Sequence, residues 1–169
     1  MIELDQHLVL VGMMAVGKTT VARAAAERLG RPLFDSDVMI EQRTGRTVRE
    51  IFADEGEVVF RTLESEMLNI ALANEEPAVI AAAGGVVLSA DNRAALNAAT
   101  AHVVWLCGDP STLLERIQAH DHRPLLDSDP AGTLQRMFRE REMLYREVAD
   151  EVVVVDDRSI AEVVEKVLQ

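Results

Sequence analysis

Four residues near the N-terminus have the types and the spacing that bind phosphate. Gly12, Gly17, Lys18 and Thr19 fit the pattern G-x-x-x-x-G-K-[ST]. In this pattern backbone N–H groups surround a phosphate, the lysine reaches the β and γ oxygens, and the hydroxyl ligates magnesium. The pattern therefore predicts a loop that binds a nucleoside triphosphate together with Mg²⁺.

The segments on either side of this loop have the required character. Leu8–Val11 is a short apolar run typical of a buried strand, and Thr19–Leu29, followed by Gly30, has the pattern of a helix. The positive N-terminus of that helix would face the bound anion. Ala15 stands where many such loops have a third glycine, and a positive φ there would cost about 1 kcal/mol or more.

Two carboxylates, Asp35 and Asp37, follow the second apolar run. Side chains at i and i+2 of an extended segment share a face, so both should point into one crevice. Two such acids suit magnesium on one and a substrate hydroxyl on the other. The alternative is that one of them only caps the following helix, which we expect over Val38–Thr44.

Two further sets of residues could either contact a ligand or only support the fold. Ala83-Gly84-Gly85 follows the third apolar run, where missing side chains let a ligand approach backbone N–H groups. A plain tight turn would look the same. Arg61 lies on a helix expected over Gly56–Asn74, where a surface ion pair with Glu57, four residues earlier, is the ordinary interpretation.

Three more arginines leave the same choice open. Arg123 lies in the polar stretch 119–130, a long irregular segment that is a candidate lid. Arg141 and Arg146 lie on a charged helix expected over Arg136–Glu147, where a solvated face is the default. None of these arginines identifies a binding site by itself.

Short β-rich runs alternate with helical patterns along the chain, which predicts a parallel sheet covered on both faces. In such sheets ligands gather beyond the carboxyl ends of the strands, where the residues above lie. The five expected strands are Val9–Val11, Leu33–Asp35, Val79–Ala82, Val103–Cys107 and Val152–Val155. Helix starts are indicated by Thr47 with Glu50, Asp109-Pro110, Asp129-Pro130, and Ser159 with Glu162.

Length, composition and charge limit the class of protein. A chain of 169 residues is expected to form a single domain, and its apolar runs are far shorter than the ~18 residues that a membrane span needs. The net charge of −12 disfavours nucleic acid and anionic membranes as partners. Fifteen arginines against two lysines suit bidentate binding of carboxylate or phosphate. We therefore expect a cytoplasmic protein, most simply a monomer, that acts on small molecules.

Two other kinds of site are disfavoured. Cys107 is the only cysteine, so it forms no internal disulfide, and its place after an apolar run predicts a buried structural thiol. His120 and His122 lack a further histidine or cysteine at ligand spacing, so a solvated loop is favoured over a metal site of the zinc type.

Taken together, these segments resemble the shikimate kinase family. The shared blocks occur in the same order and spacing from Gly12 to about Val155, and the second of them is the most specific. They are GMMAVGKTT, LFDSDVMIEQRTGRTVREIFADEGEVVFRTLE, AGGV, HRPLL and REMLYREVA. The resemblance implies a three-layer α/β/α sandwich of the P-loop, nucleoside-monophosphate-kinase-like type. Its five-stranded parallel sheet would have the order 2-3-1-4-5. It also implies an acceptor-binding region at about 35–62 and a mobile lid at about 119–130.

The resemblance also implies ATP-dependent phosphorylation of the shikimate 3-hydroxyl, in chorismate and aromatic amino acid biosynthesis, and a role for each matching residue. Lys18 would contact phosphate, Thr19 and Asp35 would hold Mg²⁺, the latter through water, and Asp37 would bind the acceptor hydroxyl and take its proton. The carboxylate of shikimate would be held by Arg61, Arg141, Gly84 and Gly85. Arg123 would contact the transferring phosphate and Arg116 the adenine. The remaining ATP contacts would come from Gly12, Met13, Met14, Ala15, Val16, Gly17 and Thr20.

The chain departs from the family pattern in three places. Ala83 replaces the first glycine of the usual triple-glycine turn, and Met143 stands where a proline is common. The segment 156–159, which should border the adenine, lacks the proline often found nearby, so no adenine contact is assigned there.

Two alternatives remain beside phosphorylation of shikimate. The first is a P-loop kinase with another acceptor, gluconate or a nucleoside monophosphate, although a paired arginine clamp favours a carboxylic acid. The second is a nucleotide- or shikimate-binding regulator without catalysis, motivated by Ala15 and Ala83, which replace expected glycines. Lys18, Asp37 and Arg123 are all present, which argues against the regulator.

Overall fold

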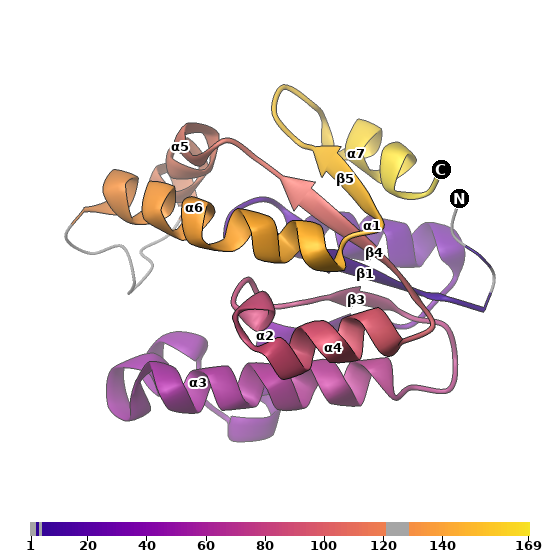
Figure 1. Cartoon of the computed structure of the whole chain (residues 1–169), viewed down its shortest axis with the longest axis horizontal. Helices are drawn as coiled ribbons and strands as arrows, with labels where there is room; N and C mark the ends of the chain where they lie inside the picture. Colours follow the sequence, from indigo (N-terminus) through magenta and orange to yellow (C-terminus); the bar gives the residue numbers. More distant parts are fainter. Residues whose placement is uncertain (1–2, 4, 121–128) are drawn as a thin grey trace.

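The computed structural model contains a five-stranded, all-parallel sheet (Figure 1). It describes residue 3 and residues 5–120 and 129–169. The strand order is β2-β3-β1-β4-β5, as the family resemblance implies. Val9, in the central strand, pairs with Ile80 on one side and Val103 on the other. The strands are β1 (His7–Val11), β2 (Leu33–Asp35), β3 (Val79–Ala81), β4 (Ala101–Cys107) and β5 (Glu151–Val154).

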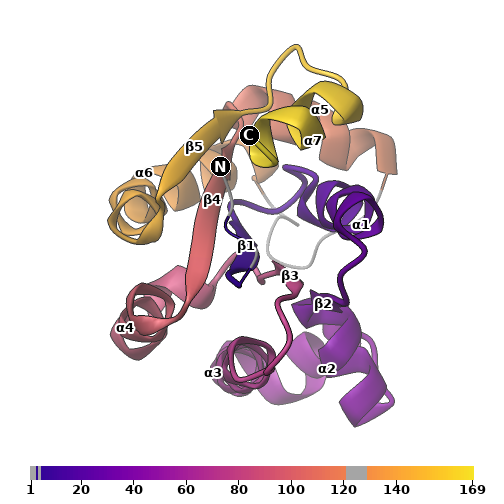
Figure 2. The same ribbon diagram turned by 90° about the vertical axis from the view of Figure 1, so that its right-hand side faces the viewer.

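Helices cover both faces of this sheet, with α1 and α7 on one face and α4 and α6 on the other (Figure 2). The α/β/α arrangement expected from the alternating pattern is confirmed. The helices of the described residues are α1 (Lys18–Leu29), α2 (Ser36–Thr44), α3 (Val48–Leu72), α4 (Ala90–Ala98), α5 (Pro110–His120), α6 (Pro130–Val148) and α7 (Ile160–Val167), with a short 3₁₀ turn, η1 (Val86–Leu88).

The helix boundaries follow capping residues that the sequence indicates. Thr47 and Ser159 each form a capping box with the glutamate three residues later, and Asp129 accepts a hydrogen bond from the Gly132 N–H. Gly30 ends α1 in the left-handed conformation. These helix ends are therefore stabilised by residues close to them in the sequence.

Helix α3 contains the helix expected over Gly56–Asn74 as its second segment, which ends at Leu72. Helix α3 begins at Val48, and Gly56 interrupts it with φ 81° and ψ 177°, values that are not helical. Gly56 thus separates two helical segments at a kink, so the boundary expected at this glycine is confirmed, as is the separate helix start at Thr47. The charged helix expected over Arg136–Glu147 is longer, because α6 spans Pro130–Val148.

One apolar core lies between the sheet and its helices, and a smaller cluster joins α2 to α3. The smaller cluster consists of Ile40, Ile51, Phe60 and Met67. Cys107, expected to be buried, is only partly buried at the end of β4, and burial raises the pKa of its thiol. In the described part of the chain, every helix is too short or too polar to span a bilayer.

The candidate lid falls largely outside the described residues. Of the stretch 119–130, residues 121–128 are not described. Helix α5 ends at His120, and α6 begins at Pro130. Arg123 and His122 are among the residues not described.

Candidate active site

The loop between β1 and α1 has the backbone geometry that a phosphate site requires. Gly12 has φ 147°, and a Cβ there would lie 2.5 Å from the Leu106 carbonyl oxygen, so only glycine fits. Gly17 has φ 103° and directly precedes α1. Ala15 has φ 62°, so the condition considered for this alanine holds, and the positive φ costs about 1 kcal/mol or more.

Two basic side chains bind the carbonyl groups of this loop. The Lys18 ammonium donates to the carbonyl oxygens of Gly12 at 2.8 Å and Met13 at 2.9 Å. On the other side of the loop, Arg116 on α5 donates to the Val16 carbonyl at 3.2 Å and more weakly to that of Ala15. Both cations therefore lie directly beside the backbone that would surround the phosphates.

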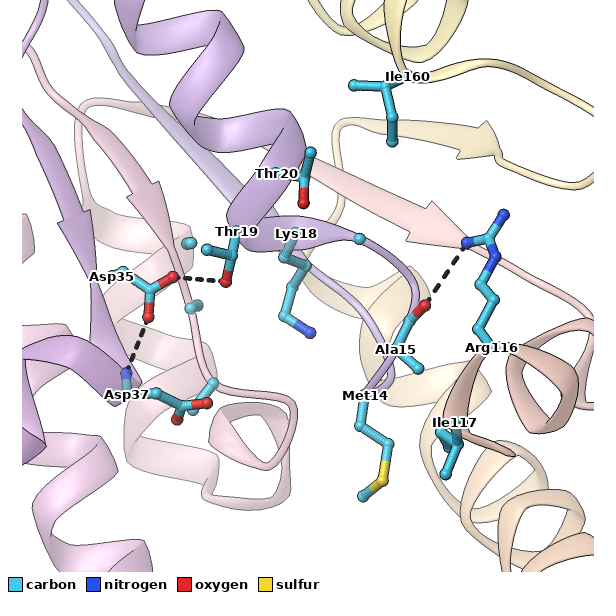
Figure 3. A pocket seen from close by; sticks show the side chains of 14 residues that line it. Met14, Ala15, Lys18, Thr19, Thr20, Asp35, Asp37, Arg116, Ile117 and Ile160 are labelled. Atoms are coloured by element: carbon cyan, nitrogen blue, oxygen red, sulfur yellow. Dashed lines mark hydrogen bonds between the residues drawn. The ribbon is translucent and has the colours of Figure 1, made fainter. Parts of the chain in front are cut away.

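The loop opens into a cavity of about 500 Å³ (Figure 3). Figure 3 shows Lys18 and the two aspartates on one side of the loop, and Arg116 with Ile117 on the other. The cavity is lined by Met14, Ala15, Gly17, Lys18, Thr19, Thr20, Asp35, Asp37, Ala81, Ala82, Ala83, Arg116, Ile117 and Ile160. We call the loop between β1 and α1, residues 12–17, the phosphate-type loop. Residues from β3, α5 and the start of α7 thus line the same cavity as this loop.

Asp35 and Asp37 both line this cavity, as expected, but for a different reason. The strand ends at Asp35, and Asp37 lies in the first turn of α2 instead of an extended segment. Asp35 Oδ1 accepts from the N–H groups of Asp37 and Val38, so Asp35 caps the helix, as the alternative interpretation held. Its other oxygen, Oδ2, accepts a 2.6 Å hydrogen bond from the Thr19 hydroxyl. One carboxylate therefore both caps α2 and contacts the phosphate-type loop.

The turn Ala83-Gly84-Gly85 packs tightly against two parts of the site. A Cβ on Gly84 would lie 3.2 Å from the Gly12 carbonyl oxygen, and one on Gly85 would lie 1.8 Å from Arg61 Nη1. Ala83 is not among the described residues with positive φ, so its methyl group needs no strained backbone. The missing side chains at 84 and 85 thus allow close approach to the loop and to Arg61.

Arg61 and Arg141 reach this turn from two different helices. Arg61, on α3, pairs with Glu57 at 2.8 Å, as the ordinary interpretation expected, and also with Glu64 at 2.6 Å. Arg141, on α6, donates to the Gly84 carbonyl at 3.3 Å. It is 6% exposed, so the solvated position that the charged helix suggests is wrong.

The environment of these arginines is unusual in charge and burial. Among the described side chains, the buried Arg141 Nε has no hydrogen-bond partner. Glu64 is buried as well, and burial raises the pKa of its carboxyl. The nearby positive charges of Arg61 and Arg141 lower this pKa, and the negative charge of Asp37 raises it. Arg61, Arg141, Asp37 and Glu64 therefore form one electrostatic group, and of these four only Asp37 is among the residues that line the cavity.

Several residues near the loop, the turn and the arginines were not assigned to the site from the sequence. Glu64 and Tyr145 are buried beside the arginines, and Ile117 and Ile160 line the cavity. Glu64 lies three residues after Arg61 and Tyr145 four after Arg141, spacings that put each on the same helix face as its arginine. That spacing could have identified both.

A family model matches residues 14–169, and its description is shikimate kinase. The chain belongs to the shikimate kinase family. A shikimate kinase of Symbiobacterium thermophilum is 43% identical over 96% of this chain and 94% of its own. One from Streptomyces coelicolor is 44% identical over 95% of this chain and 92% of its own.

Solved structures of the family have the same fold. A shikimate kinase from Acinetobacter baumannii, determined in complex with shikimate, superimposes with a TM-score of 0.91 at 39% identity. The match covers 97% of this chain and 91% of that one. The strand order 2-3-1-4-5 and the phosphate-type loop are thus those of the family, as the resemblance implied.

Proposed function

We propose that this protein transfers the γ-phosphoryl group of ATP to the 3-hydroxyl of shikimate, giving shikimate 3-phosphate and ADP. The observation that carries this assignment is the Gly84-Gly85 turn, which packs against Gly12 of the phosphate-type loop and against Arg61. Arg141 binds the same turn from α6. A carboxylate held there would lie close to the phosphate-type loop, because Gly84 packs against the Gly12 carbonyl.

The nucleotide is assigned to the loop 12–17 and the start of α1. Backbone N–H groups of a loop that precedes a helix favour phosphate, and Lys18 would exchange its two loop carbonyls for phosphate oxygens. Arg116 and Ile160 line the side of the cavity farther from the acids, which suits the base. We keep Arg123 as the lid residue that contacts the transferring phosphate, although it lies outside the described residues.

The residues at the acidic side of the cavity fit a magnesium ion. Mg²⁺ prefers oxygen ligands, keeps several waters and is held by one or two protein groups together with substrate phosphates. The Thr19 hydroxyl and the Asp35 carboxylate, 2.6 Å apart, offer such oxygens. No cluster of three His, Cys, Asp or Glu side chains that could hold a metal alone occurs in the described chain, so a shared site with ATP is the expected kind. When bound, the ion neutralises charge on the phosphates.

The acceptor is assigned to Asp37 and the two arginines. Arg61 and the buried Arg141, with its unused Nε donor, offer two positive groups to one carboxylate, which favours a carboxylic acid acceptor. In the transfer the 3-hydroxyl oxygen forms a bond to the γ-phosphorus as the bond from that phosphorus to the ADP oxygen breaks. Asp37 accepts the hydroxyl proton, and Lys18 and Arg123 stabilise charge on the phosphoryl oxygens.

Coupled measurement of ADP release from the purified protein tests this function. ADP should form only when ATP, Mg²⁺ and shikimate are all present, and gluconate and nucleoside monophosphates should not replace shikimate. ATP binding without shikimate-dependent turnover would contradict the proposal and favour a regulator. Turnover with gluconate or a nucleotide would reassign the acceptor. That the protein acts as a cytoplasmic monomer stays a prediction from its sequence.

A further inference from the structure

Tyr145, the only tyrosine of the chain, lies one helical turn after Arg141 and is fully buried. Its hydroxyl donates a 2.7 Å hydrogen bond to the Gly84 carbonyl oxygen, which also accepts the longer 3.3 Å bond from Arg141. A tyrosine phenol is protonated at neutral pH and so can donate, and burial raises the pKa of Tyr145 further, to about 12. The shorter of these two bonds to Gly84 therefore comes from a residue to which the proposed mechanism gives no role.

The ring of Tyr145 is held by its neighbours. It stacks on Trp105 of β4 with centroids 5.5 Å apart and planes 18° from parallel. Trp105 is itself 1% exposed, and the Arg146 guanidinium lies 5.1 Å from its ring centroid. A ring packed against a central strand has little freedom, so its hydroxyl has a fixed position relative to the sheet.

Gly84 is the point at which this fixed hydroxyl meets the site. Because a peptide unit is planar, fixing the Gly84 carbonyl also fixes the direction of the Gly85 N–H. There is no room for a Cβ on either glycine, because the Gly12 carbonyl lies beside Gly84 and the Arg61 guanidinium beside Gly85, so a rotated peptide would move against these groups. The orientation of this one peptide therefore affects the place assigned to the acceptor's carboxylate.

We propose that the Tyr145 hydroxyl is a positioning group that sets the Gly84–Gly85 peptide and thereby the preference for a carboxylate on the acceptor. The proposal rests on the proposed function. A side chain that only fills the core would affect stability and would change the binding of all ligands alike. A positioning hydroxyl affects the ligand group that the turn contacts.

Tyr145→Phe removes the hydroxyl and keeps the ring, so it tests this role with little risk to folding. Calorimetry should compare shikimate with its analogue in which CH₂OH replaces the carboxylate. The variant should bind shikimate about fivefold more weakly, the size of one net hydrogen bond, and bind the alcohol and ATP nearly unchanged. Without ligand, amide hydrogen exchange across 83–88 should be faster in the variant.

Val148→Ala is the matched control, because Val148 is buried on the same helix but lies beyond Tyr145. It should lower the melting temperature and leave the acid-to-alcohol preference unchanged. Equal weakening of both ligands in Tyr145→Phe, or unchanged binding of shikimate, would overturn the role of Tyr145 alone. A wild-type protein that binds neither ligand would overturn the proposed function and this preference together. Unchanged exchange across 83–88 would show independently that the hydroxyl does not hold the turn.

Discussion

The Thr19 hydroxyl donates a 2.6 Å hydrogen bond to Asp35 Oδ2 and so joins the first turn of α1 to the end of β2. The second oxygen of the same carboxylate accepts from two N–H groups at the start of α2. Asp35 therefore has a capping function, which an amide can replace, and a charge, which an amide cannot replace. These two functions can be separated by substitution.

Asp35→Asn is expected to separate them, because asparagine caps helices as well as aspartate does. The free energy of unfolding should change by less than about 1 kcal/mol, whereas Asp35→Ala should lose about 1 kcal/mol or more. The Mg²⁺ concentration for half-maximal activity should rise about tenfold or more in the Asn variant, because a group that supports the ion loses its charge. Urea unfolding and Mg²⁺ titration of turnover measure these effects.

Ser89→Ala provides the control for capping alone. Ser89 caps α4 by accepting from the Asn92 N–H at 3.3 Å, and it does not line the cavity. The Ser89→Ala variant should have a lower free energy of unfolding than the wild type, and its activity should depend on Mg²⁺ as that of the wild type does. A wild-type Mg²⁺ dependence in Asp35→Asn would contradict the proposed part of Asp35 in the metal site.

Arg141 and Arg146 form a matched pair on one helix for testing the acceptor site. Arg141 is buried at Gly84, whereas Arg146 is half-exposed and pairs with Glu142. Arg141→Ala should raise the KM for shikimate about tenfold to a hundredfold, the loss of a hydrogen bond to a charged group, with the KM for ATP nearly unchanged. Arg146→Ala should leave both values close to wild type. Equal loss of ATP and shikimate affinity in Arg141→Ala would count against the assignment.

Much of the fold could be predicted from local sequence because parallel strands are short apolar runs between capped helices. Predicted strand positions such as Leu33–Asp35 agree with the structure, and Thr47 with Glu50 correctly indicated a helix start. The strand order does not follow from such patterns, because it depends on which strands pair in space; it came from the resemblance to a family. Gly56 was a reliable signal of the same local kind, since its non-helical φ and ψ mark the kink between the two helical segments of α3.

The arginines show why the site was harder to predict than the fold. A charged helix predicts solvent exposure, and Arg146 fits that expectation, but Arg141 does not. Arg141 lies four residues after Met137 and four before Tyr145, both buried, so it belongs to the apolar face of α6. Only its hydrogen bond to the Gly84 carbonyl, 57 positions earlier in the chain, shows that this face reaches the glycine turn. Local sequence carries no information about such a contact.

His7 predicts a pH dependence of stability. Its buried ring accepts a 3.0 Å hydrogen bond at Nδ1 from the Ala78 N–H, and burial lowers its pKa below the ordinary value of 6.5. Between the lowered pKa and 6.5 the unfolded chain therefore binds more protons than the folded one. Stability should be fully present above pH 6.5 and should fall as the pH is lowered toward the folded-state pKa.

Urea unfolding from pH 8 to pH 5 measures this fall. His7→Asn is the control, because asparagine offers an acceptor oxygen but does not titrate in this range. Glu50 and Glu162 have lowered pKa values because of hydrogen bonds from their capping residues, so their losses belong to more acidic conditions. The decline below pH 6.5 should be smaller in the Asn variant, and equal declines in both proteins would assign the effect to another group.

Gly84 and Gly85 are adjacent, but alanine at each should affect a different substrate. A Cβ on Gly85 would lie 1.8 Å from Arg61 Nη1 and 2.8 Å from Glu64 Oε2, atoms at the ends of flexible side chains. Gly85 has φ −92°, which alanine adopts without strain, so Gly85→Ala should fold and displace the Arg61 guanidinium. The KM for shikimate should rise about tenfold through loss of this charged contact, with the KM for ATP nearly unchanged.

Gly84→Ala would meet backbone instead of side chain. Its Cβ would lie 3.2 Å from the Gly12 carbonyl oxygen and 3.5 Å from the Met14 nitrogen, so the phosphate-type loop itself must move by a few tenths of an ångström. Because backbone yields less readily than the end of an arginine, this variant should raise the KM for ATP and lower the melting temperature more than Gly85→Ala does. Steady-state kinetics with each substrate varied in turn measures both values. Gly85→Ala with an unchanged KM for shikimate would mean that Arg61 does not bind the acceptor, whereas an unchanged KM for ATP in Gly84→Ala would mean that the turn and the loop move independently.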